Sequence, residues 1–285
     1  MIGVVILNYK TYNDTYELIE SIHKLSVPED LKIIVVDNCS VEEKLCELKN
    51  KVKRFNYDVL YLSEMENLGF ARGMNIGISM ALKLGCNYVV CSNNDIILPS
   101  SFSFSGLISK YEIKNDTALI GPRILTLSNE EQNPLYVSNP FKSKLKSSLT
   151  KIIVYLPFIG RYFYIARGIL KEYLLADKFR QKNGRVQSYE DIYCMHGAFF
   201  VLTPSYFKYY NGLDKNTFLY FEELILASRI KLINCKSEFN NDYYVIHKED
   251  SSTNEALGGE GFKKRLFVLK ENYKSLCYFV KNYLN

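Results

Sequence analysis

The sequence predicts an α/β fold with a mostly parallel central sheet and helices on both of its faces. The first observation is that apolar runs of strand length alternate four times with segments of helical periodicity over the first 120 residues. The second is that these runs are continuously apolar, which is typical of strands buried on both faces. Alternation of this kind favours a doubly wound parallel sheet.

The expected elements follow in chain order. Strands are predicted at 2–9 (IGVVILNY), 31–38 (LKIIVVDN), 58–63 (DVLYLS), 86–95 (CNYVVCSNND) and 117–122 (TALIGP). Helices are predicted between these strands, over 14–25, 42–52, 69–85 and 102–113. Asp14 and Glu17 can cap the first helix, and Gly85 ends the third. The alternation breaks from about 125 to 185, after which we expect a strand and helix at 193–207, a helix at 216–230, a strand at 242–247 and an amphipathic helix at 261–284.

Composition limits the function classes. A chain of 285 residues with 47% hydrophobic and 24% charged residues suits one large globular domain, or one domain with an appendage. Its seven cysteines form no CxxC pair, which favours reduced thiols in a cytoplasmic protein. We expect neither a signal peptide nor a spanning helix, because the first apolar run is short and no stretch of about 18 apolar residues exists.

The net charge of +5 is concentrated in one segment. Residues 141–185 carry eleven Lys and Arg residues against Glu172 and Asp177, a local charge of +9 that leaves −4 for the rest of the chain. This distribution argues against a protein that coats nucleic acid. The segment mixes its cations with apolar and aromatic residues, which suits an anionic membrane surface. A helical dimerisation arm and a solvated face are the alternatives.

Polar residues recur where the predicted strands end. The strand ends read Asn8-Tyr9, Asp37-Asn38, Ser63-Glu64 and Asn93-Asn94-Asp95. In doubly wound sheets, ligands bind outside the carboxyl ends of the strands. A turn is the other interpretation of the last group, because Asn and Asp side chains bond to their own backbone in turns. Recurrence at one edge of the sheet favours a binding site.

A glycine-rich turn precedes the third predicted helix. The run NLGFARGMNIG, residues 67–77, is not GxGxxG, and the first strand is followed by Asn-Tyr-Lys. The dinucleotide fingerprint of an oxidoreductase is therefore missing where it is expected. Tight packing of the helix is one explanation of these glycines. The other is a nucleotide-sugar site built from Asn67, Gly69, Arg72 and Asn75.

Six segments occur in the order found in family 2 glycosyltransferases, which the chain resembles. They are VVILNYKTYNDTYELIESI, IIVVDNCS, NLGFARGMNIGI, VVCSNND, MHGAFFVLTPSYFKYYNGLDKNTFLYFEE and YYVIHKEDSST. The resemblance covers about residues 1–125 and 190–255, and it is greatest to the rhamnosyltransferase-like branch of bacterial polysaccharide biosynthesis. It implies a GT-A-type domain over 1–255, with a basic helical insert at about 140–186 and a C-terminal amphipathic helical extension at 256–285.

The resemblance also implies a donor site. Asn93-Asn94-Asp95 is similar to the family's DxD-type motif, whose last aspartate binds a divalent metal that bridges the donor's diphosphate. Asp95 would thus bind Mg²⁺ or Mn²⁺, with His247 reaching the metal or the diphosphate. Asp37 would contact the base or ribose. Further donor contacts would come from Asn8, Tyr9, Asn93 and Asn94.

The run FLYFEELILASR resembles the family's Tyr-x-Glu-Asp-x-Asp pattern and the arginine that follows it. Glu222 and Glu223 occupy the paired acidic positions and Arg229 the basic one, which implies Glu223 as the base that deprotonates the acceptor hydroxyl. Acids at a helix start are otherwise ordinary partners of the helix dipole. The later acidic position holds Ile225, which leaves room for an inactive or unusually selective member.

The function implied is inverting, metal-dependent transfer of a hexosyl or rhamnosyl group. The donor would be a UDP- or dTDP-linked sugar, and the acceptor a growing, lipid-linked oligosaccharide of a capsule or exopolysaccharide. Gly197, in MHGAFF, resembles the floor of the acceptor site, and His196 beside it is left out of catalysis. The enzyme would be cytoplasmic and peripheral on the inner face of the cell membrane. The alternative is a catalytically weak, sugar-nucleotide-binding paralogue with a regulatory or scaffold role.

Overall fold

The structure is a computed structural model that describes residues 1–26, 30–55, 57–112, 114–156, 159–166, 168, 192–249 and 262–284. The expected basic insert at about 140–186 lies partly outside these residues. The expected domain boundary at 255 lies wholly outside them. Among the described residues, no helix is both long and apolar enough to cross a bilayer.

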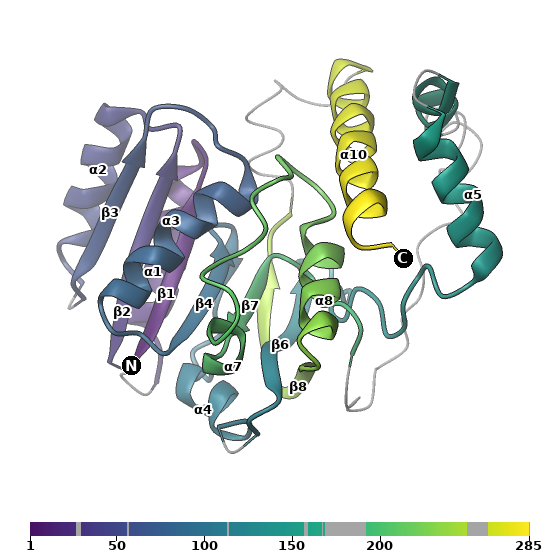
Figure 1. Cartoon of the computed structure of the whole chain (residues 1–285). Coiled ribbons are helices and arrows are strands. Elements are labelled where there is room, and N and C mark those ends of the chain that lie inside the picture. The colour runs from purple at the N-terminus through teal and green to yellow at the C-terminus, as the bar shows by residue number, and fades with distance from the viewer. Residues whose placement is uncertain are drawn as a thin grey trace.

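Strands and helices alternate over the first half of the chain (Figure 1). The elements are β1 (Ile2–Asn8), α1 (Tyr12–His23), β2 (Leu31–Asn38), α2 (Glu42–Val52), β3 (Val59–Glu64), α3 (Phe70–Lys83), β4 (Tyr88–Asn93), β5 (Ile96–Ile97), α4 (Phe104–Ser109) and β6 (Thr117–Thr126). They continue with α5 (Lys144–Tyr155), β7 (Phe199–Leu202), α7 (Pro204–Phe207), α8 (Glu222–Leu232), β8 (Lys236–His247) and α10 (Phe262–Asn282).

The strands form one eight-stranded sheet in the order β3-β2-β1-β4-β7-β6-β8-β5. The first four strands in this order are parallel, as the continuous apolar runs predict. β7 then pairs antiparallel with both β4 and β6, β6 and β8 are parallel, and the short β5 pairs antiparallel with β8. The expected mostly parallel sheet is confirmed, with β7 and β5 as its antiparallel members.

Each face of the sheet has its own core, which explains why the strands are apolar throughout. On β1, Val4 and Ile6 belong to a cluster formed with α1, α2 and α4. Val5, which points to the opposite face, belongs to a cluster formed with α3, α7 and α8. Side chains alternate between the faces of a strand, so a strand covered on both faces is apolar at consecutive positions rather than at every second one.

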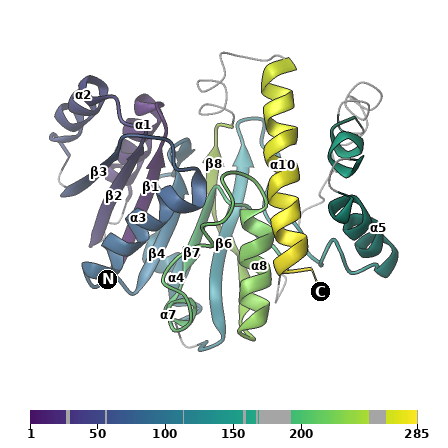
Figure 2. The same cartoon turned by 45° about the horizontal axis from the view of Figure 1, so that its top comes forward.

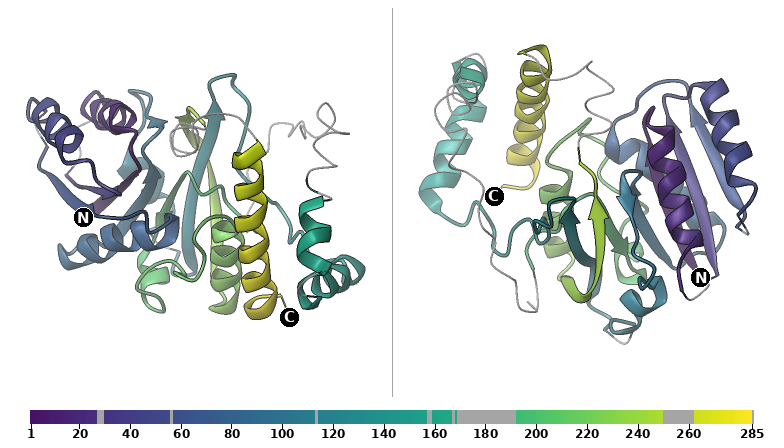
Figure 3. Two further views of the ribbon diagram at one scale, coloured as in Figure 1. Left: turned by 90° about the horizontal axis from the view of Figure 1, so that it is seen from above. Right: turned by 180° about the vertical axis from the view of Figure 1, so that it is seen from behind.

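A third apolar cluster lies outside the sheet and attaches α10 to the molecule. The outer side of α8, with Ile225, packs in this cluster with Phe279 and Val280 of α10 and with Val154 of α5. Figure 2 and Figure 3 show α10 between α8 and α5, so that α5 is separated from the sheet by the whole width of this helix. Ile225 is therefore a core residue, which accounts for its apolar side chain at a position where the family pattern is acidic.

Candidate active site

The polar strand ends surround a cavity of about 490 Å³ at the carboxyl edge of the parallel strands. The cavity is lined by residues from the ends of β1, β2 and β4, from the turn before α3, from the start of β7, from α8 with the loop before it, and from α10. The lining consists of Leu7, Tyr9, Asn38, Asn67, Gly69, Phe70, Asn93, Asn94, His196, Gly197, Ala198, Phe218, Leu219, Tyr220, Glu222, Glu223 and Phe267. The structure thus brings Tyr9, Asn67, Gly69, Asn93, Asn94, Gly197 and both glutamates of the sequence prediction to one cavity.

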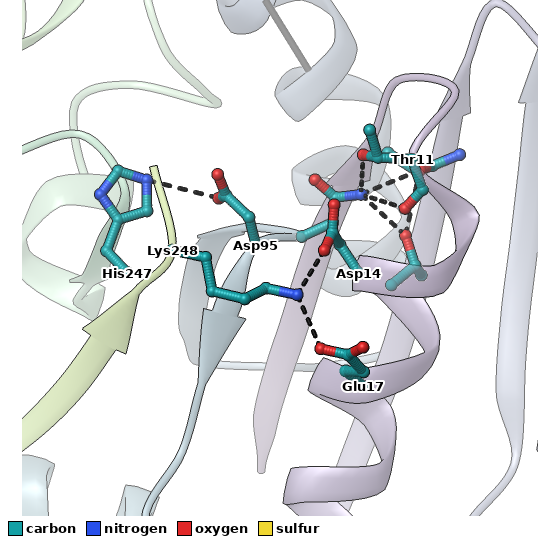
Figure 4. A network of polar contacts seen from close by, with 9 residues as sticks. Thr11, Asp14, Glu17, Asp95, His247 and Lys248 are labelled. Carbon is teal, nitrogen blue, oxygen red and sulfur yellow. Dashed lines mark hydrogen bonds and ion pairs between the residues drawn. The ribbon is translucent and has the colours of Figure 1, made fainter. Parts of the chain in front are cut away.

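Asn94 is bound into the protein although it also lines the cavity. Its Nδ2 lies 2.9 Å from Oδ1 of Asn8, 3.0 Å from Oγ1 of Thr15, and 2.9 and 2.7 Å from the carbonyl oxygen and Oγ1 of Thr11. Figure 4 shows Thr11, one of these partners, at the start of α1. The Asn94 amide therefore anchors the end of β4 to α1, which positions the next residue, Asp95.

Asp95 faces His247 from the neighbouring part of the sheet (Figure 4). Its Oδ1 lies 3.4 Å from Nε2 of His247, and both side chains are buried. Nδ1 of His247 lies 2.8 Å from Oε1 of Gln132, and Nε2 of Gln132 donates to Glu249. Because Glu249 takes the amide hydrogens, the Gln132 oxygen faces the ring and accepts from Nδ1. In a neutral imidazole with this tautomer, the His247 nitrogen that faces Asp95 carries the lone pair.

Asp95 and His247 are a suitable pair of ligands for a divalent cation. A carboxylate oxygen and an imidazole lone pair that face each other at 3.4 Å are both acceptors, so a cation placed with them relieves their repulsion. Gln132 acts as the outer partner that sets the tautomer of the imidazole. No group of three or more His, Cys, Asp or Glu residues in the described part of the chain is arranged to hold a metal.

Lys248 connects this pair to α1. Its Nζ donates to Asp14 and, at 2.7 Å, to Oε2 of Glu17, while its backbone N–H donates to the carbonyl of Asp95 at 3.0 Å. Figure 4 shows the side chain reaching across to the helix. The two carboxylates raise the pKa of Lys248 against the opposing effect of its burial. The end of β8 is thereby held beside Asp95 and α1.

Asn8 and Asp37, which the sequence predicts at the donor nucleotide, are buried and do not line this cavity. Asp37 is fully buried and accepts from Nδ2 of Asn8 (2.7 Å), the hydroxyl of Tyr12 (2.9 Å) and Oγ of Ser40 (2.7 Å). The second polar atom of Asn8, Oδ1, accepts from Thr15 at 3.0 Å. The two residues form a hydrogen-bonded connection between β1, β2 and α1.

Asn38 holds the glycine-rich turn at the cavity. Its Oδ1 accepts from the N–H of Leu68 at 2.9 Å, and its Nδ2 donates to Oδ1 of Asn67 at 3.0 Å. Gly69 has φ of +82°, and a Cβ there would lie 2.2 Å from the carbonyl oxygen of Phe218. Glycine is required because of both the left-handed backbone and this close approach. The turn consequently presents backbone and Asn67 to the cavity.

Arg72, Asn75 and Arg229 do not line this cavity, and all three side chains bond to a loop of the protein instead. Nε of Arg72 donates to the carbonyl of Lys215 at 2.9 Å, and the Asn75 amide both donates to and accepts from the backbone of Leu213. Arg229 donates to the carbonyl of Gly212 at 3.0 Å and lies 3.8 Å from the ring centre of Tyr210. All three side chains hold the loop that leads to Phe218 and α8.

Glu222 and Glu223 begin α8 and face the cavity. Tyr220 and Phe221 before them have left-handed backbones, with φ of 71° and 69°, which start the helix at Glu222. Such conformations are strained in residues with side chains and gather at functional sites. Burial raises the pKa of both carboxyl groups, and the charge of Glu223 raises that of Glu222 further. The pair therefore favours holding one proton near neutral pH.

Gly197 provides the space that Glu223 occupies. A Cβ on Gly197 would lie 2.8 Å from Oε1 of Glu223, and the backbone N–H of Gly197 bonds to this carboxylate. That bond favours the charged form of Glu223 and opposes the effect of burial. The start of β7 and the start of α8 together determine where the carboxylate lies.

Several residues of the site are absent from the sequence-based donor and catalytic sets, among them Asn38, His196, Gln132 and Phe267. Asn38 ends a predicted strand, and His196 is in MHGAFF, so both had a recognisable signal, whereas Gln132 and Phe267 had none. The His196 ring centre is 5.6 Å from that of His247. Burial, with a smaller contribution from His247, lowers the pKa of His196 to about 4. Its Nδ1 accepts from the N–H of Ala198 at 3.1 Å, so the ring is neutral and protonated on Nε2.

Comparisons with known proteins agree with this geometry. Residues 3–174 match the family model "Glycosyl transferase family 2". The structure is similar to residues 1–349 of S. aureus TarS, with a TM-score of 0.54 and 11% identity over 95% of this chain and 70% of that one. It is also similar to GalNAc-T7 in complex with UDP, GalNAc and Mn²⁺, with a TM-score of 0.60 and 12% identity over 88% of this chain and 44% of that one.

A comparison with curated proteins finds no match. At 11% and 12% identity, the two solved structures support the GT-A fold rather than a particular substrate. The family model covers well over half of the chain, including the glycine-rich turn, Asp95 and the strands that end at the cavity. The chain therefore belongs to glycosyl transferase family 2 and is a glycosyltransferase with a GT-A fold.

Proposed function

We propose that the protein is an inverting, metal-dependent glycosyltransferase that moves a hexosyl or rhamnosyl group from a UDP- or dTDP-linked donor to a lipid-linked oligosaccharide. The observation that carries the proposal is that Glu222 and Glu223 face the same cavity as Asn93 and Asn94 at the end of β4. A base and a donor-binding edge are thus within one space of about 490 Å³, enough for a sugar and part of a nucleotide.

Glu223 is the base in this proposal. An inverting transfer requires that a carboxylate remove the proton of the acceptor hydroxyl as its oxygen attacks the anomeric carbon. A raised pKa makes a carboxylate a stronger base, and the Gly197 N–H keeps Glu223 in the charged form while Glu222 retains the shared proton. After the transfer, the proton is on Glu223 and passes to solvent through the open cavity.

The donor side uses the opposite wall of the cavity. Tyr9 and the glycine-rich turn, with Asn67 and Gly69, offer an aromatic ring, an amide and backbone groups to the nucleotide. Asp95 and His247 would hold a divalent cation, Mg²⁺ or Mn²⁺. When bound, this cation neutralises negative charge on the diphosphate leaving group. Asn94 and Lys248 keep these two ligands in place from behind.

The metal assignment is tested with Asp95→Ala and His247→Ala. We expect Mn²⁺ titrated in the presence of UDP or dTDP to bind the wild-type protein, and binding to be lost in Asp95→Ala and weakened less in His247→Ala. Calorimetry measures this without requiring an acceptor, and transfer to an acceptor extract is the second readout. Asp58→Asn is the matched control, since Asp58 is exposed before β3 and contacts neither the two ligands nor Lys248. Undiminished Mn²⁺ binding by Asp95→Ala contradicts the assignment.

The alternative, a weakly active paralogue, had Ile225 as its support in the sequence. Because Ile225 packs in the cluster that attaches α10, its apolar side chain is explained by packing. Donor hydrolysis with and without Mn²⁺ separates the two functions. Metal-dependent release of the nucleotide supports transfer, and binding of the donor without any release supports the paralogue.

A further inference from the structure

We propose that α5 and the helix at 159–166 form a docking surface for a bilayer with anionic headgroups. We call residues 141–156 and 159–166 the arm. Seven large apolar side chains on it have between 47% and 74% of their surface exposed, namely Leu149, Ile152, Tyr155, Leu156, Ile159, Tyr162 and Phe163. Apolar clusters of this extent on a protein surface mark sites of interaction with proteins or membranes.

The arm has an inner and an outer side. Its inner side packs on α10, where Val154 is buried, the Tyr164 ring lies 5.5 Å from that of Tyr273, and the Tyr273 hydroxyl donates to the carbonyl of Ile153 at 3.3 Å. Leu149, Ile152 and Leu156 are spaced three and four residues apart, so they form one stripe on the other side. This stripe and the exposed residues of 159–166 are the outer side.

Charge decides which partner fits the outer side. Residues 141–167 contain six cationic residues, Lys142, Lys144, Lys146, Lys151, Arg161 and Arg167, and no acidic residue. Lys144 and Lys146 lie in the first turn of α5, where a cation opposes the helix dipole and no acid offsets it. A second copy of this chain would bring two such clusters together and be repelled. Anionic headgroups attract the cations, and the acyl region accepts the apolar side chains.

The arm is placed where a membrane-bound acceptor can reach the cavity. In Figure 1 the arm rises beside α10 towards the side of the molecule at which β1, β2, β3 and β4 end, and the view from behind in Figure 3 agrees. α10 contacts both places, since Phe267 lines the cavity and Tyr273 holds the arm. The docking surface rests on exposure and charge alone. Its use in presenting a lipid-linked acceptor rests on the proposed function.

Sedimentation of the full chain with phosphatidylcholine vesicles, with and without phosphatidylglycerol, tests the docking surface. We expect the wild-type protein to sediment with the phosphatidylglycerol vesicles at low salt, and to be released as salt rises because the attraction is screened. Wild-type protein that stays in the supernatant with these vesicles at low salt overturns the proposal.

Two variants with matched controls locate the surface. Ile159→Glu with Phe163→Glu should lower vesicle binding at least tenfold, whereas Leu127→Glu with Leu232→Glu, at exposed apolar positions outside the arm, should not. Vesicle binding should fall by about fivefold for each cation removed in the triple variant Lys142→Ala, Lys144→Ala and Lys146→Ala. The control triple variant Lys44→Ala, Lys51→Ala and Lys83→Ala, at exposed lysines outside the arm, should bind vesicles almost as the wild-type protein does. Arm variants that bind vesicles as wild type does overturn the proposal.

Light scattering and donor hydrolysis distinguish the remaining outcomes. If the wild-type protein is a dimer that Ile159→Glu with Phe163→Glu converts to a monomer, without any change in vesicle binding, the arm is an interface between copies and the proposal is wrong. Hydrolysis of the donor in solution should be unchanged in the arm variants. A wild-type protein that binds vesicles but neither transfers nor hydrolyses would contradict the proposed function and leave the docking surface supported.

Discussion

Asp37 and the pair Glu222–Glu223 are carboxylates in opposite situations. Asp37 is fully buried, and three donors from Asn8, Tyr12 and Ser40 bond to its two oxygens. The two glutamates face the cavity, lie next to each other in the chain, and have pKa values raised by burial. The Asp37 carboxylate joins β2 to β1 and α1, whereas the two glutamate carboxylates are placed where they can react with a bound ligand.

The difference shows how position alone can mislead. Asp37, near the end of β2, and Asp95, just after β4, both lie at the carboxyl edge, where ligands bind in doubly wound sheets. A polar side chain that is already hydrogen-bonded on all sides stabilises the fold, and removing it leaves unsatisfied donors behind. A carboxylate buried beside another carboxylate is costly to the fold, and sites of this kind are where catalytic groups are found. Four variants test this distinction.

Glu223→Gln is expected to have the largest effect. The amide keeps the shape of the side chain but cannot accept the proton, so the transfer rate should fall by about two to four orders of magnitude while donor binding is retained. Steady-state kinetics and calorimetry with the donor measure the two quantities. Glu222→Gln is the control, and a loss confined to Glu222→Gln would show that the two roles are reversed.

Asp37→Ala is expected to lower the stability of the fold. Three donors, two of them buried, lose their acceptor, which should lower the free energy of unfolding by about 3 kcal/mol. Urea unfolding of the ligand-free protein measures this change in the free energy of unfolding. Asp58→Ala, on the surface before β3, should change the stability little. Unchanged stability of Asp37→Ala together with lost donor binding would show that Asp37 is a ligand contact after all.

Gly197→Ala should displace Glu223, because the added methyl group would lie 2.8 Å from Oε1. We expect a loss of about tenfold in the transfer rate, an order-of-magnitude value for a misplaced catalytic group. Combining this change with Glu223→Gln should cost no more than Glu223→Gln alone, since the displaced group is then already inactive. Additive losses would show that Gly197 acts on something other than Glu223.

The smallest expected effect concerns pH and stability. A carboxyl group whose pKa is higher in the folded protein than in the unfolded chain binds more protons when folded, so stability falls as pH rises above the unfolded value. Glu222→Gln removes this penalty and should raise Tm by about 2–4 °C at pH 8, with no gain near pH 4. Glu47→Gln, an exposed control on α2, should give no such dependence. A gain of equal size at both pH values would contradict the raised pKa.

Much of the site could be predicted because it depends on local pattern. The apolar runs and their polar ends predict where Tyr9, Asn93 and Asn94 lie, since the carboxyl ends of parallel strands meet at one edge. The glycines at 67–77 predict a tight turn there. Arg72 and Asn75 could not be assigned in this way, because their partners, Lys215 and Leu213, lie 143 and 138 residues away.

The sequence by itself determined the strand and helix order, the two apolar faces of the sheet, the polar edge and the paired acids, because each depends on residues close together in the chain. The tertiary structure alone decided which polar side chains face the cavity and which make all their hydrogen bonds within the protein. Asn8 bonds to Asp37 across 29 residues, and Asn94 bonds to Thr11 across 83. A polar side chain has few hydrogen-bonding groups, and the partners that long-range packing places beside them decide whether any is left for a ligand.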